Sequence, residues 1–147
     1  TSTSLSASPA LATVRSSIAT VDSKQTAYNA ALDTAIESPS AANQAAVVTA
    51  LGNLKSSMQT VQLQVAALPT DVPSDTRSKL NAYVSTGNAA VAVEDEIIQG
   101  SLACSKKRTP SAAQACISAL DNATTARERQ ALTTWRDSIV ALGYQIR

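Results

Sequence analysis

The segment VVTALGNLKSSMQTVQLQVAAL (residues 47–68) decides the fold class. Its apolar side chains recur at alternating spacings of four and three residues: Val47, Leu51, Leu54, Met58, Val61, Val65 and Leu68. This spacing places them on one stripe of an α-helix that faces a seam of the coiled-coil type. Ser40 is the expected N-cap, and the two prolines of PTDVPSD (residues 69–75) end the run. We therefore predict a helix over residues 41–68.

Three further apolar runs have the same helical spacing, over residues 9–37, 75–103 and 110–146. A capping residue followed by proline opens the first and the last of them, at Ser8–Pro9 and Thr109–Pro110. Long helices joined by short connections pack antiparallel to their neighbours. The sequence thus predicts an all-α, antiparallel up-down-up-down four-helix bundle with coiled-coil-like heptad seams.

The bulk composition indicates a single domain over residues 9–147, preceded by a polar tether, TSTSLSAS (residues 1–8). We interpret the tether as the stretch that follows a removed signal peptide or a lipid anchor. The 12 basic and 11 acidic side chains give a net charge of +1, which argues against a nucleic-acid partner because phosphate binding scales with positive charge. No apolar run is long enough to predict a transmembrane segment.

The only two cysteines, Cys104 and Cys116, flank the basic cluster Lys106, Lys107 and Arg108. They fall at the end of the third predicted helix and near the start of the fourth, so we predict a disulfide between them. Such bonds persist in oxidising compartments, which places the protein outside the cytoplasm. Two reduced, buried cysteines are the alternative. The basic cluster suits the C-terminal end of a helix and is also the candidate contact for a partner.

The sequence contains no histidine and only four glycines. The usual general base and the Glu-x-x-His ligands of di-iron bundles are therefore missing, and no glycine-rich phosphate loop is present. We expect no enzymatic activity, no cofactor and no metal site.

Polar residues that interrupt the apolar seams are the candidate functional positions. Counting along the helices from the three turns aligns residues of different helices in layers: Tyr28, Leu51, Glu94 and Ser118; then Gln25, Leu54, Val91 and Asp121; then Val21, Met58, Gly87 and either Thr124 or Thr125. Trp135 falls level with Leu11, Leu68 and Arg77, at the end of the bundle.

Glu94 occupies a core-type position in this alignment. A carboxylate there is costly unless it is hydrogen-bonded, and the Tyr28 hydroxyl and the Gln25 amide are its expected partners, with a raised pKa. Alternatively, Glu94 lies at the edge of the seam with its carboxylate in water.

Gly87 either permits close packing of helices or leaves a void beside Val21, Met58 and Thr124 that accepts a small apolar ligand. A register slip around residues 127–131 brings Arg127 and Glu128 near the interior of the last helix. Arg127 either extends its charge to solvent or points inward as an anchor for a carboxylate.

These observations predict an extracytoplasmic, non-enzymatic binding or interaction module, secreted or membrane-tethered, with an envelope protein as a possible partner. A bundle that binds a small apolar or amphipathic ligand in an internal cavity is the alternative, and a structural envelope spacer is the third interpretation. The candidate ligand-binding residues are Val21, Gln25, Tyr28, Met58, Gly87, Glu94, Thr124 and Arg127.

Overall fold

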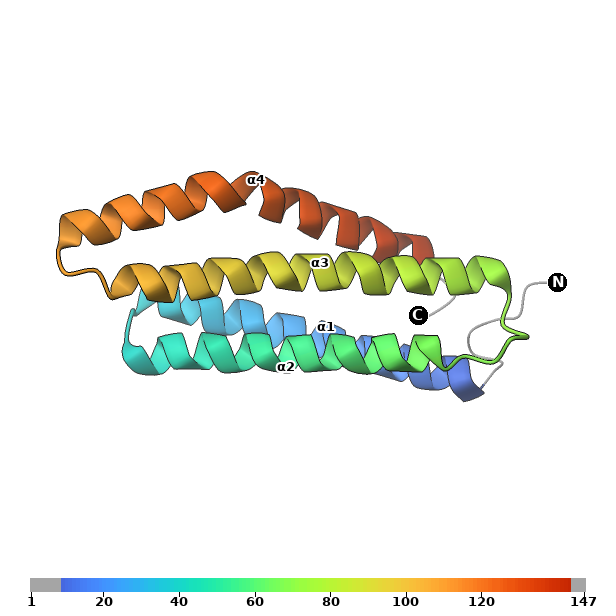
Figure 1. Cartoon of the computed structure of the whole chain (residues 1–147). Helices are drawn as coiled ribbons and strands as arrows, with labels where there is room; N and C mark the ends of the chain where they lie inside the picture. Colours follow the sequence, from blue (N-terminus) through green and yellow to red (C-terminus); the bar gives the residue numbers. More distant parts are fainter. Residues whose placement is uncertain (1–8, 144–147) are drawn as a thin grey trace.

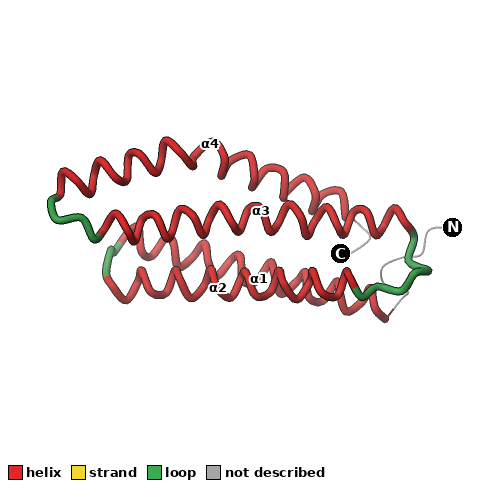
Figure 2. Tube along the Cα trace, viewed as in Figure 1, coloured by secondary structure: helices red, strands yellow, loops and turns green. Residues whose placement is uncertain are grey.

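The computed structural model describes residues 9–143, which form four long α-helices and no strand (Figure 1, Figure 2). The helices are α1 (Pro9–Glu37), α2 (Ala41–Ala66), α3 (Ser74–Ser105) and α4 (Pro110–Leu142). Figure 1 shows each helix returning alongside the one before it. The predicted all-α four-helix bundle is confirmed. The expected tether at residues 1–8 and the last four residues lie outside the described part of the chain.

The helix ends agree closely with the predicted capping residues. The Ser40 side chain accepts a hydrogen bond from the Asn43 backbone N–H at 3.0 Å, and the Thr109 side chain accepts one from the Ala112 N–H at 3.1 Å. α2 ends two residues earlier than predicted, and α3 extends to Ser105. Small differences of this kind are common because helix ends fray.

The core follows the apolar runs. All the apolar residues that define the run at 47–68 are buried, as are Leu11, Val14, Ile18 and Val21 of α1. Burying a side chain of this size contributes about 1.5–3 kcal/mol, so the four stripes supply the main driving force for folding.

The helices do not enclose the core equally on all sides. Close backbone packing joins α1 to α2, α2 to α3 and α3 to α4, whereas α1 and α4 share no comparable contact in the described residues. Figure 1 and Figure 2 show α4 lying over α3, away from α1. The bundle is consequently open along the side between its first and last helices.

α4 is bent near its middle (Figure 1). The hydroxyls of Thr124 and Thr125 donate to the carbonyls of Leu120 and Asp121, at 2.8 and 2.7 Å. Hydrogen bonds from threonine to the carbonyl one turn earlier tend to bend a helix. Thr124 is the only fully buried residue in the first half of α4, whereas Trp135, Ser138 and Leu142 are buried in the second half. α4 is therefore anchored mainly by its C-terminal half.

The predicted layers are wrong for α4. Gly87 lies against Trp135 rather than Thr124, and Glu94 meets Glu128 rather than Ser118. Trp135 therefore lies beside the middle of α3 and not at the end of the bundle. The error is about three helical turns, since Trp135 stands where Thr124 was expected. The error arises at the α3–α4 turn, whose geometry sets the register of the two helices. The predicted layers were counted through this turn without using the cysteine pair, which fixes that register.

Candidate functional site

A cavity of about 280 Å³ lies on the open side of the bundle, between α1 and α4, with α2 and α3 behind it. Its apolar wall consists of Leu54, Ala90, Val91, Leu132, Trp135 and Ile139. Its polar groups come from Gln25, Tyr28, Asn29, Glu94 and Arg136. All four helices contribute, so the site exists only in the folded bundle.

Glu94 is the most deeply placed charged side chain of this wall, with only 7% of its surface exposed. The Tyr28 hydroxyl donates a hydrogen bond of 2.7 Å to Glu94 Oε2. The inward position of Glu94 is therefore correct, and the edge position with the carboxylate in water is wrong. Of its two expected partners, Tyr28 makes the hydrogen bond, while Gln25 lies in the wall of the same cavity.

Glu128 of α4 brings a second carboxyl group to Glu94. Burial raises the pKa of Glu94 to about 7; the hydrogen bond and charge of Glu128 also raise it, and the Tyr28 hydrogen bond lowers it. Two carboxylates this close repel each other unless a proton or another cation lies with them. Below neutral pH the Glu94–Glu128 pair accordingly keeps a proton.

Tyr28 remains a hydrogen-bond donor in this cluster. Its burial and its contact with the Glu94 carboxyl raise the pKa of Tyr28 far above the usual value for a phenol. Tyr28, Glu94 and Glu128 thus form a polar link from α1 through α3 to α4. We call these three residues the carboxyl cluster.

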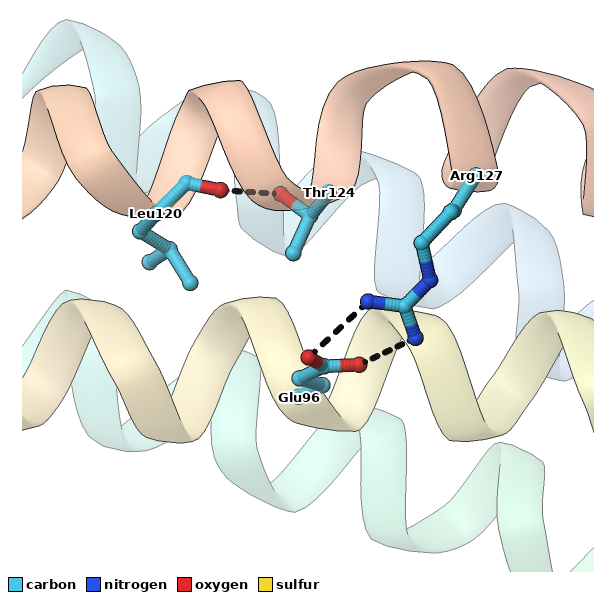
Figure 3. A network of polar contacts seen from close by, with 4 residues as sticks. All are labelled: Glu96, Leu120, Thr124 and Arg127. Atoms are coloured by element: carbon cyan, nitrogen blue, oxygen red, sulfur yellow. Dashed lines mark hydrogen bonds and ion pairs between the residues drawn. The ribbon is translucent and has the colours of Figure 1, made fainter.

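Arg127 is not part of the cavity. Its guanidinium donates to both carboxylate oxygens of Glu96, at 3.1 and 2.7 Å, and both side chains are about half exposed (Figure 3). This hydrogen bonding holds the pKa of Glu96 below its usual value. The inward carboxylate anchor considered for Arg127 is therefore wrong, and the side chain directs its charge to solvent.

The void considered beside Gly87 is filled. A Cβ atom at position 87 would lie 2.5 Å from Met58 Cε and 2.9 Å from Trp135 Nε1. Gly87 thus serves close packing. Val21 and Met58 are fully buried in the core, and the Thr124 hydroxyl bonds to Leu120 (Figure 3), so these residues do not line the cavity.

Trp135 is the cavity residue that sequence reasoning assigned elsewhere. Its ring is tilted against that of Tyr83, with centroids 6.2 Å apart, and its side chain forms part of the cavity wall. Its buried indole Nε1 has no hydrogen-bond partner among the described residues. The signal that identifies its position is the cysteine pair: stepping along both helices from Cys104–Cys116 places Gly100 beside Leu120 and Gly87 near Trp135.

The predicted disulfide is confirmed, with the Cys104 and Cys116 sulfurs 2.01 Å apart. It closes the connection between α3 and α4 and leaves Lys106, Lys107 and Arg108 exposed. The basic cluster lies at one end of the bundle, away from the cavity residues Trp135 and Ile139. Its role in partner binding remains a prediction.

No protein-family model, curated protein or solved structure matches this chain. None of α1 to α4 combines the length and the apolar character that a membrane span requires. Residues 9–143 contain no group of three or more His, Cys, Asp or Glu side chains that could hold a metal ion. The functional conclusion therefore rests on the cavity itself.

Replacing Glu94 with glutamine should remove a pH dependence of stability. The pKa of Glu94 is about 7 in the folded chain, above the ordinary value of 4.5 for a glutamate, so the folded state holds the proton more tightly. The stability from this group is fully present below pH 4.5 and is lost as the pH rises to about 7. Glu94→Gln keeps an acceptor for Tyr28 and should raise the free energy of unfolding at pH 8 by about 2 kcal/mol.

Urea denaturation at several pH values measures this effect. Glu96→Gln, two residues away in the same helix, is the matched control, because Glu96 is exposed and pairs with Arg127. The control should show no gain at pH 8. A Glu94→Gln variant that retains the slope of the parent protein between pH 4.5 and 7 would contradict the assignment of that slope to Glu94.

Proposed function

We propose that this protein is an extracytoplasmic, non-enzymatic binding module that holds a small amphipathic ligand between α1 and α4. The observation that carries the proposal is the cavity on the open side of the bundle. Binding sites for small molecules combine a mostly apolar lining with a few polar groups that fix orientation. The wall joins Leu54, Val91 and Trp135 to polar groups that include Tyr28 and Glu94, a mixture that suits an amphipathic ligand.

The shape of the open side favours an elongated ligand. A second hollow of about 730 Å³ lies along α1, where it is lined by Ala12, Arg15, Ser16, Ile18, Ala19 and Asp22, and it shares Ile139 of α4 with the cavity. A groove thus continues from the carboxyl cluster toward the start of α1. A compound with a polar end and a short apolar chain fits this arrangement, the polar end at Glu94 and the chain along Ile139.

The Cys104–Cys116 disulfide supports the extracytoplasmic location, because disulfides of this structural kind are rare in reducing compartments. The absence of histidine from the sequence supports binding rather than catalysis, since the residue most often used as a general base is missing. The perturbed carboxyl, Glu94, contacts Tyr28 and Glu128 rather than a nucleophile with a base partner.

Trp135 is the single tryptophan of the chain, so its fluorescence reports directly on the cavity. We expect a saturable change in emission on titration with at least one of octylamine, 1-octanol and octanoate. Leu132 is half-buried in the cavity wall. Leu132→Phe places a larger side chain in the cavity and should weaken this binding at least fivefold. The expected loss follows because a filled cavity excludes the apolar chain.

Val140→Phe is the matched control, because Val140 lies on the same helix with 70% of its surface exposed. This variant should bind like the parent protein, and thermal midpoints of both variants verify that they fold. The absence of a saturable change for all three compounds would contradict the proposed function.

A further inference from the structure

We propose that the polar end of the ligand is an organic ammonium group, which binds at the carboxyl group of Glu94, next to Glu128. This inference rests on the proposed function and names the chemical class of its ligand. The supporting geometry is the buried Glu94 carboxyl in the cavity wall, which lies beside aromatic side chains and within hydrogen-bonding reach of Glu128 from α4.

Ionising both carboxyl groups is unfavourable when no cation lies with them. Glu94 is buried and lies within hydrogen-bonding reach of Glu128, while its Oε2 already accepts a hydrogen bond from Tyr28. Ionising buried Glu94 beside a second carboxylate is unfavourable, so the pair holds a proton below about pH 7 unless another positive group replaces it. The proton is the resident cation when the cavity lacks a ligand.

An ammonium group can take the place of that proton. It carries a full positive charge and up to three N–H donors, which suit the remaining lone pairs of two carboxylates. Tyr28 and Trp135 supply aromatic rings to the same wall, and ring faces attract organic cations. The apolar part of the ligand then follows Leu132 and Ile139 along the groove.

Trp135 packs its indole nitrogen close to Gly87 of α3, so this atom is not exposed to the cavity. Its side chain is 2% exposed, and its Nε1–H has no acceptor among the described residues. A buried donor without a partner costs about 1–3 kcal/mol. This cost belongs to the tight packing of α4 on α3 and does not identify a ligand.

The other charged groups around Glu94 also bear on ligand choice. Tyr28 faces it from α1 and Glu128 from α4, whereas the contribution of α2 to the cavity wall is the uncharged Leu54. Arg136 of α4 lines the same cavity but is exposed, so solvent screens its charge more effectively than that of buried Glu94. Buried Glu94 therefore outweighs the exposed Arg136, and a carboxylate ligand is disfavoured.

Binding of an ammonium ligand should be linked to loss of the proton from the carboxyl cluster. The pKa of Glu94 is about 7, so this proton exchanges near neutral pH. Below pH 7 the balance is one organic ammonium taken up and one proton released to solvent, whereas well above pH 7 little proton is left to release. Binding should therefore weaken as the pH falls through 7 and the proton competes more strongly with the ligand.

Octylamine, 1-octanol and octanoate share one apolar chain and differ in the polar end, so they test the inference directly. With Trp135 fluorescence at pH 7.5, we expect octylamine to bind at least tenfold more tightly than 1-octanol, and octanoate to bind most weakly. At pH 5.5 the advantage of the amine should fall at least fivefold. Calorimetry in two buffers of different ionisation enthalpy should detect proton release on amine binding.

Glu94→Gln removes the anionic pair and should leave octylamine and 1-octanol with affinities within about twofold of each other, because an amide does not attract the cation. Glu128→Gln is the second variant and should reduce the amine preference as well. Glu96→Gln should retain the preference, since that carboxylate lies outside the cavity with Arg127.

The possible outcomes separate the two proposals. If 1-octanol or octanoate binds as tightly as octylamine, or if Glu94→Gln keeps the amine preference, the ammonium site is wrong while the ligand cavity stands. If none of the three compounds binds, the proposed function itself is contradicted.

Discussion

Gly87→Leu should lower the free energy of unfolding by about 3 kcal/mol, which corresponds to a fall of about 10 °C in Tm for a chain of this size. A Cβ atom at this position would already lie 2.5 Å from Met58 Cε and 2.9 Å from Trp135 Nε1. Met58 can yield because its end is flexible, but the indole ring is rigid and is held against Tyr83. The three further carbons of leucine would have to displace α4 from α3.

Gly52→Leu is the matched control for this substitution. Gly52 also lies inside a helix, yet a Cβ there would meet no atom within 4 Å. Leucine should raise stability at this position by about 0.5–1 kcal/mol, because glycine is a poor helix former. Chemical denaturation of both variants measures the difference. Equal effects at the two positions would contradict the tight α3–α4 packing described for Gly87.

Reduction of the Cys104–Cys116 disulfide should cost about 3 kcal/mol of stability, from the loop entropy that the bond removes from the unfolded chain. The bond joins two residues that lie 12 positions apart in the sequence. We further expect the loss of stability to be uneven along α4. Its first half buries only Thr124 completely, whereas Trp135, Ser138 and Leu142 hold its second half.

Hydrogen exchange on the Cys104→Ser, Cys116→Ser double variant measures this distribution. Amides of residues 110–123 should lose protection first, and the emission of Trp135 should change little. Uniform loss along α1 to α4 would contradict the local role of the bond. Thiol counting on protein extracted under thiol-blocking conditions is the control. Two free thiols in that protein would contradict both the disulfide and the extracytoplasmic location inferred from it.

Local features of the candidate site could be predicted well from the sequence. The Tyr28–Glu94 contact was expected because the layers of α1 and α3 were counted correctly through their turns, and a carboxyl group on an apolar seam needs a hydrogen-bond donor. The caps at Ser40 and Thr109 were expected because a side-chain oxygen before a helix satisfies free backbone N–H groups.

The parts of the site that depend on α4 were not predicted. Trp135 was assigned to the end of the bundle, and the void was placed at Gly87, although Trp135 and Met58 fill that space. Both errors have one origin, the position of α4 along α3. The Cys104–Cys116 pair indicates the correct alignment of α4 along α3, since bonded cysteines must lie at the same level.

The sequence alone determined the four helices, the caps of α2 and α4, the disulfide and the presence of a carboxyl group within an apolar seam. Each of these depends on interactions over a few residues or on a fixed rise of about 1.5 Å per residue within one helix. The tertiary structure decided how far α4 slides along α3, that α1 and α4 remain apart, and that Glu94 meets Glu128. These depend on side chains packing between helices, where a repeating apolar stripe is compatible with several registers and only the fit of particular residues selects one.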